Sequence, residues 1–141
     1  AAIGALARAG IPVHVSVSPV IPAITDHEIE HILAAAADAG ASAAFFIPVR
    51  LPHEVAPLFR AWLETHHPDR ADKVMTIIRS IRDGRDNDPG FFSRMRGSGP
   101  WAELLRTRFA IACRRLGLNK ERLVLRTDLF RSPEGSQMRL L

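Results

Sequence analysis

The sequence predicts an α/β fold in which two strand–helix units with parallel strands precede a mainly helical extension. Two short apolar segments, residues 11–22 and 41–52, have the composition of strands, and each is followed by a segment with helical periodicity. A third observation is the change after residue 67, where arginine becomes frequent and the remaining periodic segments are helical. The expected division is therefore residues 1–67 for the strand–helix units and 68–141 for a basic, mainly helical extension.

The first element expected is a short helix that ends at Gly10. Ile3, Leu6 and Ala7 have helical spacing, and glycine is the usual residue just beyond a helix C-terminus. No capping residue or methionine precedes this helix. We therefore expect the chain to be a fragment of a longer protein.

The first strand is expected in IPVHVSVSPVIP, residues 11–22, where valines alternate with polar residues such as Ser16 and Ser18. This period of two predicts a strand with one apolar face. Because proline cannot donate to an interior ladder, Pro19 and Pro22 are expected to end the strand.

The helix that follows is expected to begin with a capping box, in which Thr25 and Glu28 satisfy each other's free backbone N–H groups. Gly40 ends it, and the nearly continuous apolar run ASAAFFIPVRLP, residues 41–52, predicts the second strand. Such a run favours burial on both faces of a parallel sheet. A further amphipathic helix is expected before Pro68.

The second half of the chain is expected to contain two helices, one over about residues 69–82 and one that Ser98 or Gly99 opens together with Pro100 and that Gly117 ends. The segment between them is rich in glycine and polar residues, and so long a connection in a compact domain is usually functional or disordered. Residues 70–115 carry a net charge of about +6, whereas residues 1–69 carry about −4.

Composition limits the classes of protein to which the chain can belong. The chain has 141 residues, of which 47% are hydrophobic, and Cys113 is its one cysteine. A disulfide or a cysteine-cage metal site within the chain is therefore excluded, and a reducing, cytoplasmic location is expected. No run of about 18 apolar residues occurs, so we expect no contact with a membrane.

His27, Glu28 and His31 spell H-E-x-x-H, the pattern of a zinc peptidase helix. Two histidines at i and i+4 can reach one zinc ion, with the glutamate as general base. No third-ligand signature accompanies them, and the expected capping box already uses Glu28. We therefore interpret the pattern as a polar helix face and assign no metal ligand, with a zinc-dependent hydrolase as a minor alternative.

The carboxyl ends of the two strands are the favoured binding positions, because ligands of parallel βα folds bind in the loops that follow the strands. Ser16, Ser18 and Pro19 lie near the first end, and Arg50 and Leu51 lie at the second. Arg50 is the only charge in its apolar segment, so its guanidinium requires an anionic or carbonyl partner. A structural ion pair would satisfy Arg50 equally well, and the serines are also compatible with small strand residues that bind nothing.

Several segments resemble the later part of radical S-adenosylmethionine (radical SAM) proteins, in the branch related to spore photoproduct lyase. These segments are P-V-I-P at 19–22, Asp26, R-L-P at 50–52, R-M-R-G-S-G-P at 94–100 and C-R-R-L-G at 113–117. The chain departs from the family at residues 23–25, where Ala-Ile-Thr stands in place of the usual Gly-Leu-Asn. The resemblance extends from about Ala5 to Asn119.

This resemblance implies that residues 1–67 are the last βα units of a partial, TIM-like (β/α)6 barrel, with the missing N-terminal half of the barrel as their partner. The parent protein would hold a [4Fe–4S] cluster on a C-x-x-x-C-x-x-C loop and cleave S-adenosylmethionine to a 5′-deoxyadenosyl radical. That loop is absent here and Cys113 cannot replace it, so the chain alone is expected to hold no cofactor and to lack the catalytic chemistry. By position, the resemblance assigns to S-adenosylmethionine the residues Ser16, Ser18, Pro19, Arg50 and Leu51.

The basic second half also predicts a nucleic-acid-binding module as an alternative function. Arginines can follow a phosphate backbone while aromatic side chains stack on bases. The arginines assigned to this role are Arg94, Arg96, Arg114 and Arg115. A solvated arginine-rich surface, or a patch that packs on the missing half of the barrel, is the competing interpretation. A DNA or RNA substrate is also compatible with the resemblance, because spore photoproduct lyase acts on damaged DNA.

Overall fold

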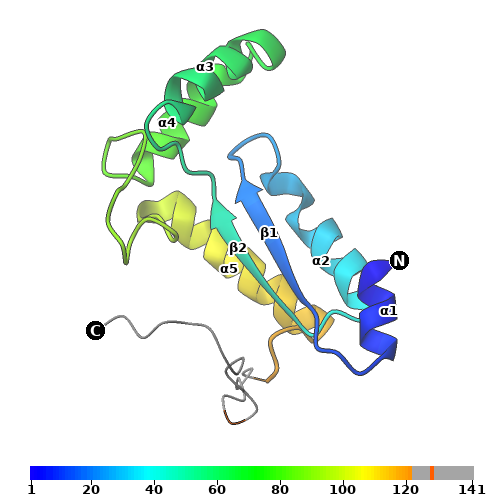
Figure 1. Ribbon diagram of the computed structural model, residues 1–141. Helices are drawn as coiled ribbons and strands as arrows, with labels where there is room; N and C mark the ends of the chain where they lie inside the picture. The colour runs from blue at the N-terminus through cyan, green and yellow to red at the C-terminus, as the bar shows by residue number, and fades with distance from the viewer. Residues whose placement is uncertain (122–127, 129–141) are drawn as a thin grey trace, which may run out of the picture.

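The computed structural model describes residues 1–121 and 128, and it confirms the expected α/β class (Figure 1). The elements, in chain order, are α1 (Ala2–Arg8), β1 (His14–Val20), the 3₁₀ turn η1 (Asp26–Glu28), α2 (Ile29–Asp38), β2 (Ala43–Pro48), α3 (Val55–His66), α4 (Ala71–Ser80) and α5 (Gly99–Leu116). The end of the extension expected over residues 68–141 lies outside the described residues.

Strands β1 and β2 form a two-stranded parallel sheet in which His14 lies opposite Ala43 and Val17 lies opposite Phe46. Helix α2 connects the two strands, so β1, α2 and β2 make the parallel strand–helix–strand unit that the sequence predicts. Helices α3 and α4 lie beyond the carboxyl ends of the strands (Figure 1).

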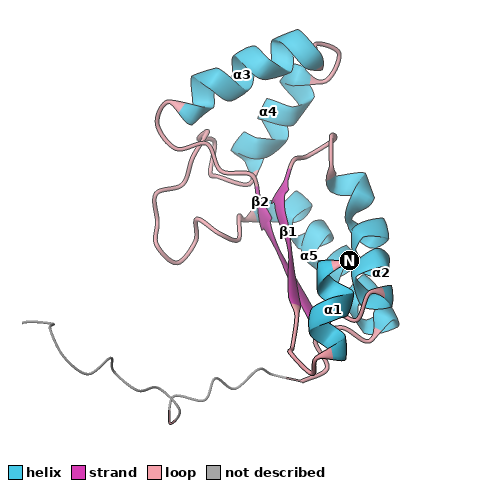
Figure 2. Ribbon diagram, turned by 45° about the vertical axis from the view of Figure 1, so that its right-hand side comes forward, coloured by secondary structure: helices cyan, strands magenta, loops and turns pink. Residues whose placement is uncertain are grey.

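Helices α2 and α5 lie on the same side of the sheet (Figure 2). The hydrophobic core on this covered face consists of Val17, Val20, Ile29, Leu33, Ala36, Ala41, Ala44, Leu105, Phe109, Ala112, Cys113 and Leu118. The opposite, open face carries exposed His14, Ser16 and Ser18 from β1 and Phe45 from β2, which is 49% exposed. Burial of the second strand on both faces is therefore wrong for the described residues, because α3 and α4 pack beyond the strand end instead.

A second core lies beyond the strands and joins the segment after β2 to α3 and α4. Val49, Leu51 and Leu63 meet Val74 and Ile78 there. The expected division at residues 67/68 falls between α3 and α4, which share this core, and α5 shares the first core with β1 and α2. That division therefore does not coincide with a boundary between hydrophobic cores.

Two local expectations are wrong. The Thr25 hydroxyl accepts a hydrogen bond from the backbone N–H of Ile21 at 2.8 Å, and neither η1 nor α2 has a side-chain cap, so no capping box forms. The hydroxyl closes the turn after β1 instead. Pro19 does not end its strand, which continues to Val20 after a cis Ser18–Pro19 peptide bond. Pairing with β2 is irregular at this point, so the missing N–H of proline is tolerated.

The end of α5 confirms one expectation and adds a contact that the sequence analysis did not predict. Gly117 adopts the left-handed conformation with φ 72°, as a helix terminator should. Two residues later, the Asn119 side chain donates to the Ala44 carbonyl and accepts from the Ala44 N–H, both at 2.9 Å. Asn119 therefore pairs with the free edge of β2 much as a further strand would.

Candidate ligand site at the carboxyl ends of the strands

The structure places Ser18 and Pro19 at the carboxyl end of β1 and Ser16 near the middle of the strand, and all three are exposed. The two serines project from the open face, where the Ser16 Oγ donates to the Ser18 Oγ at 3.0 Å. The hydroxyls therefore form a small polar patch that solvent or a ligand can reach.

Arg50 and Leu51 follow β2 after one intervening residue, Val49, and have different environments. Arg50 is half-buried, its Nη1 lies 3.8 Å from the Met95 sulfur, and its Nε is excluded from solvent with no acceptor among the described residues. A thioether is a weak acceptor, so this contact does not satisfy the hydrogen-bond donors of the guanidinium. Leu51 is 1% exposed and belongs to the second core, so its side chain anchors the segment rather than facing a ligand.

Arg82 lies at the same strand end, although it was not among the residues predicted to bind a ligand. It is only 2% exposed, and its guanidinium donates to the Val49 carbonyl at 3.2 Å and to the Arg94 carbonyl at 2.6 Å. A signal was present in the sequence, because Arg82 continues the i, i+4 row of Val74 and Ile78 on the apolar side of the helix expected over about residues 69–82, although α4 itself ends at Ser80.

Burial lowers the pKa of Arg82 from its ordinary value, the carboxylate of Asp88 opposes this shift, and the charge of Arg50 adds to it. The pKa of Asp88 is itself lowered, first by the Ser93 hydroxyl and then by the Gly90 N–H, which lies 2.7 Å from its Oδ1. Asp88 is thus an ionised group that organises the turn before Arg94 and partly balances the charge of Arg82.

Ion pairs and backbone contacts fix both ends of the long connection between α4 and α5. Asp86 pairs with Arg60 and with Arg79, the latter at 2.9 Å. At the other end, the Ser98 N–H donates to the Ile81 carbonyl at 3.1 Å. The connection is therefore held against α3 and α4 beside the carboxyl ends of the strands.

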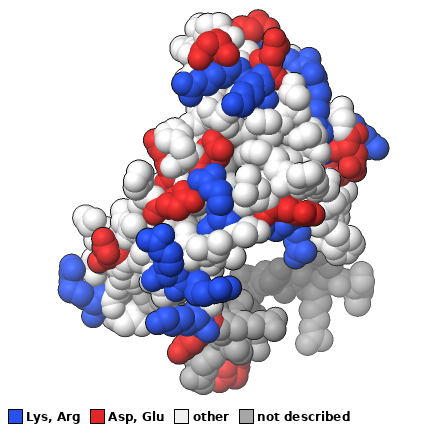
Figure 3. All heavy atoms as spheres, turned by 180° about the vertical axis from the view of Figure 1, so that it is seen from behind, with Lys and Arg blue, Asp and Glu red and all other residues white. Residues whose placement is uncertain are grey.

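The four arginines assigned to nucleic acid do not lie together. Arg94 and Arg96 precede α5, whereas Arg114 and Arg115 lie in its last turn. A helix of 18 residues is about 27 Å long, so the two pairs are well separated. On the face seen from behind, acidic side chains lie among the basic ones at the top, the middle and the lower edge (Figure 3).

Exposed aromatic side chains accompany the first of these two pairs. Phe91 and Phe92 are 71% and 89% exposed and contact each other edge to face, with ring centroids 5.2 Å apart. The Arg94 guanidinium lies over the Phe91 ring, 5.0 Å from its centroid. Exposed aromatic and cationic groups are therefore combined beside the candidate ligand site.

The H-E-x-x-H residues do not form a metal site among the described residues. His27 and Glu28 lie in the 3₁₀ turn η1 and His31 lies in α2. His27 and Glu28 are exposed, with 3.8 Å between Nε2 and Oε1. Within residues 1–121 and 128, no three histidine, cysteine or acidic side chains are grouped so as to hold a metal ion.

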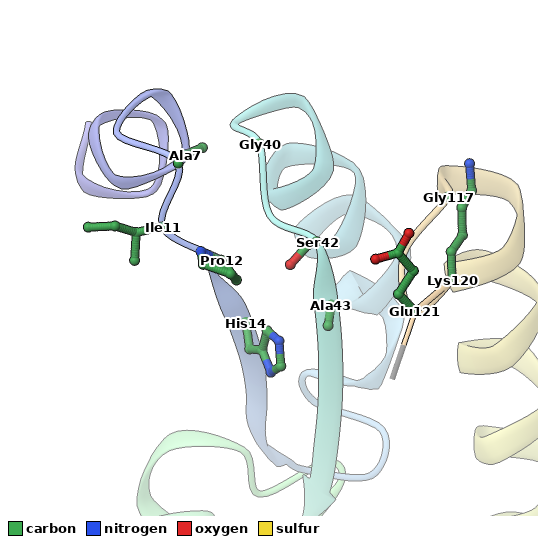
Figure 4. Close-up of a pocket in the computed structure, with 11 residues that line it drawn as sticks. Ala7, Ile11, Pro12, His14, Gly40, Ser42, Ala43, Gly117, Lys120 and Glu121 are labelled. Atoms are coloured by element: carbon green, nitrogen blue, oxygen red, sulfur yellow. The ribbon is translucent and has the colours of Figure 1, made fainter. Parts of the chain in front are cut away.

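A hollow of about 630 Å³ lies at the opposite end of the sheet, near the amino ends of the strands (Figure 4). Its lining combines backbone at Gly40 and Gly117 with the side chains of His14, Ser42 and Lys120. It is larger than a hollow of about 460 Å³ near Met95. We nevertheless favour the carboxyl ends, because buried charge without a full set of partners indicates a binding site more directly than volume does.

No protein-family model, curated protein or solved structure matches this chain. No helix in the part of the chain that the structure describes is long and apolar enough to cross a membrane.

Proposed function

We propose that the chain forms the last two strand–helix units of a radical SAM partial barrel, within a longer protein that generates a 5′-deoxyadenosyl radical from S-adenosylmethionine. The observation that best supports this proposal is the parallel β1–α2–β2 unit, on which the described helices cover one face. In a βα barrel the helices lie outside and the other face of the sheet lines the interior. The open face, with its serine hydroxyls, has the polarity that an interior ligand site requires.

The residues at the strand ends fit S-adenosylmethionine as a ligand. Its carboxylate suits the Arg50 guanidinium, whose Nε lacks an acceptor among the described residues, and its ribose hydroxyls suit Ser16 and Ser18. The bound cofactor would supply the radical chemistry. The part of this chain would be to bind and orient the cofactor and to exclude water from it.

The residues of this chain do not fit the [4Fe–4S] cluster. Such clusters are held by several cysteine thiolates, and Cys113 is the single cysteine of the chain. Cys113 is buried on α5, and burial raises the pKa of its thiol, which disfavours the thiolate. Under the proposal, the cluster cysteines therefore belong to the missing N-terminal half of the barrel.

The test uses the full-length protein, reconstituted anaerobically with iron and sulfide. We expect the visible absorption of a [4Fe–4S] cluster, and 5′-deoxyadenosine on reduction in the presence of S-adenosylmethionine. Arg50→Gln is expected to weaken S-adenosylmethionine binding while it leaves the cluster absorption intact, and Arg115→Gln is the matched control on an exposed helix face. Absence of a cluster in the folded full-length protein would refute the proposal.

Binding of single-stranded nucleic acid is the second candidate, and the exposed pair Phe91 and Phe92 beside Arg94 favours it. It predicts an affinity for single-stranded DNA or RNA that falls steeply as salt increases. Phe92→Ala should weaken binding at all salt concentrations, because a stacking surface is lost. Equal affinity of Phe92→Ala and the unmodified chain would exclude this interface.

The two pairs of arginines give a matched comparison for the same assay. Arg94→Gln with Arg96→Gln should reduce the salt dependence, whereas Arg114→Gln with Arg115→Gln should leave it unchanged, since those side chains lie at the other end of α5. If only the Arg114→Gln with Arg115→Gln variant had a reduced salt dependence, the interface would lie at the end of α5 and would not include Phe91 and Phe92.

A further inference from the structure

The guanidinium groups of Arg50 and Arg82 interact at the carboxyl end of β2, and the backbone of a third arginine, Arg94, packs against Arg82. Arg82 donates to the carbonyl of Val49, the residue before Arg50, and to the carbonyl of Arg94. Arg50 in turn contacts Met95, the residue after Arg94. These contacts connect Arg50, assigned from the sequence to a cofactor, with Arg94, assigned to nucleic acid, through the buried Arg82.

The positive charge at this point is not balanced by acidic groups of the described chain. Among residues 1–121 and 128, other arginines form ion pairs, such as Arg79 with Asp86 and Arg108 with Glu30. Within the same residues, none of the three clustered arginines has an acidic group within ion-pair distance. The nearby carboxylate of Asp88 favours the charged form of Arg82, but it also accepts from Gly90 and Ser93. One shared carboxylate leaves an excess of positive charge in a partly buried place.

Each of the three arginines also has a hydrogen-bond donor that the described protein does not use. The Nε atoms of Arg50, Arg82 and Arg94 are excluded from solvent and find no acceptor in residues 1–121 and 128. A buried donor on a charged group without an acceptor is costly, and the two neighbouring donors of Arg50 and Arg82 call for a common explanation. A guanidinium presents its donors as a planar fork that matches a carboxylate or phosphate.

We infer that Arg50 and Arg82 form one oxyanion-binding site at the carboxyl end of β2, with Arg94 at its edge. Arg82 is the fixed member, because its bonds to backbone carbonyls hold it in place. Arg50 and Arg94 are half-buried and therefore accessible to a ligand. Met95, which is 40% exposed, covers Arg50 with a flexible side chain that an incoming oxyanion can displace.

The ligand group is a carboxylate or phosphate oxyanion, and the site does not depend on the radical SAM assignment. Two sources supply that chemistry: the carboxylate of S-adenosylmethionine, or a phosphate of another ligand. The probes are therefore inorganic phosphate and S-adenosylmethionine, each added at constant ionic strength to the full chain.

The readout is the Nε–H signals of the arginines in NMR spectra of the ¹⁵N-arginine-labelled chain. We expect saturable shifts of the Arg50 and Arg94 signals with at least one probe. Arg50→Gln or Arg94→Gln should weaken that binding about tenfold, since a charge-assisted hydrogen bond is lost. Arg115→Gln, on the exposed face of α5, is the matched control and should bind as the unmodified chain does.

The two probes distinguish the sources and separate this site from the proposed function. Saturation by S-adenosylmethionine would identify the cofactor carboxylate as the bound oxyanion. Saturation by phosphate alone would support the oxyanion site but show that Arg50 does not bind the cofactor. Three results would overturn the inference. These are non-saturating shifts with both probes, unchanged affinity in both Arg50→Gln and Arg94→Gln, or an equal loss of affinity in Arg115→Gln.

Discussion

The two faces of the β1–β2 sheet are built from alternate residues of the same strands, yet they have opposite surroundings. Val17 and Phe46 point to the face that α2 and α5 cover, and Ser16, Ser18 and Phe45 point to the open face. Since the backbone is shared, the difference arises only from what packs against each face. The covered face therefore determines whether the chain folds, and the open face is free to serve a ligand.

The largest effect is expected on the covered face, from Phe109→Ala in α5. Phe109 is buried against Phe46, with ring centroids 4.8 Å apart, and its removal leaves a cavity between α5 and the sheet. The free energy of unfolding should fall by about 3 to 4 kcal/mol, measured by urea denaturation. Leu104→Ala, on the exposed side of the same helix, should change it by less than about 0.5 kcal/mol. Similar losses in the two variants would mean that α5 does not cover the sheet as described.

A smaller effect is expected at the free edge of β2, which Asn119 occupies without covering either face. Asn119 has φ 59°, so Asn119→Gly removes the side chain without the backbone strain that alanine would add. Loss of both hydrogen bonds to Ala44 should lower the free energy of unfolding by about 1 to 2 kcal/mol. Hydrogen exchange of the Ala44 amide should accelerate, and exchange as slow as in the unmodified chain would contradict this role.

The order of the elements and the position of the candidate site could be predicted from local patterns in the sequence. Alternating valines predict β1, and Ser98, Pro100 and Gly117 predict the ends of α5. The uncovered face of β2 could not be predicted, because its apolar run does not specify what packs on it. Whether α3 and α4 cover that face or pack beyond the strand depends on tertiary contacts alone.

The candidate site was predicted in part for a similar reason. Arg50 is conspicuous as the one charge in an apolar run, and its placement at the strand end follows from the order of the elements. How close Arg82 and Arg94 come to Arg50 depends on how the connection between α4 and α5 folds back. The one indication of this fold in the sequence is the i, i+4 position of Arg82. The Thr25 hydroxyl shows the same limit. It could accept a hydrogen bond either from the first turn of the following helix or from the preceding turn, and in the structure it accepts from the N–H of Ile21.

A pH-dependent effect of less than about 1 kcal/mol is expected from Glu30, which joins α2 to α5. Its carboxylate accepts from Arg108 Nε at 3.0 Å and from Nη2 at 2.9 Å. Burial raises the pKa of Glu30, but the hydrogen bond and charge of Arg108, the backbone and His31 outweigh it, so the pKa lies below 4.5. The pair therefore stabilises the fold above pH 4.5, and this contribution disappears as the pH falls through the lowered pKa.

The measurement for Glu30 compares urea denaturation of Glu30→Gln with that of the unmodified chain across this pH range. The variant should be less stable at neutral pH, by an amount reduced by the partial exposure of the pair, and the two curves should converge in acid. Glu103→Gln, on the exposed side of α5, should follow the unmodified chain at every pH. A difference that persists unchanged in acid would show that the carboxylate charge has no part in holding the covering helices together.

A much smaller effect than that of Phe109→Ala is expected on the open face, from Phe45→Ser. Phe45 is 49% exposed, so its replacement removes only about half of the burial of a core phenylalanine, and the free energy of unfolding should fall by about 1 kcal/mol. Phe46→Ser, one residue further along β2, is the matched control, and it should be strongly destabilising because it contacts Phe109 on the covered face. Equal losses in Phe45→Ser and Phe46→Ser would mean that the open face is also covered in solution. Under the proposed barrel, the asymmetry between these neighbours should vanish in the full-length protein, where the open face becomes the interior and Phe45→Ser becomes costly.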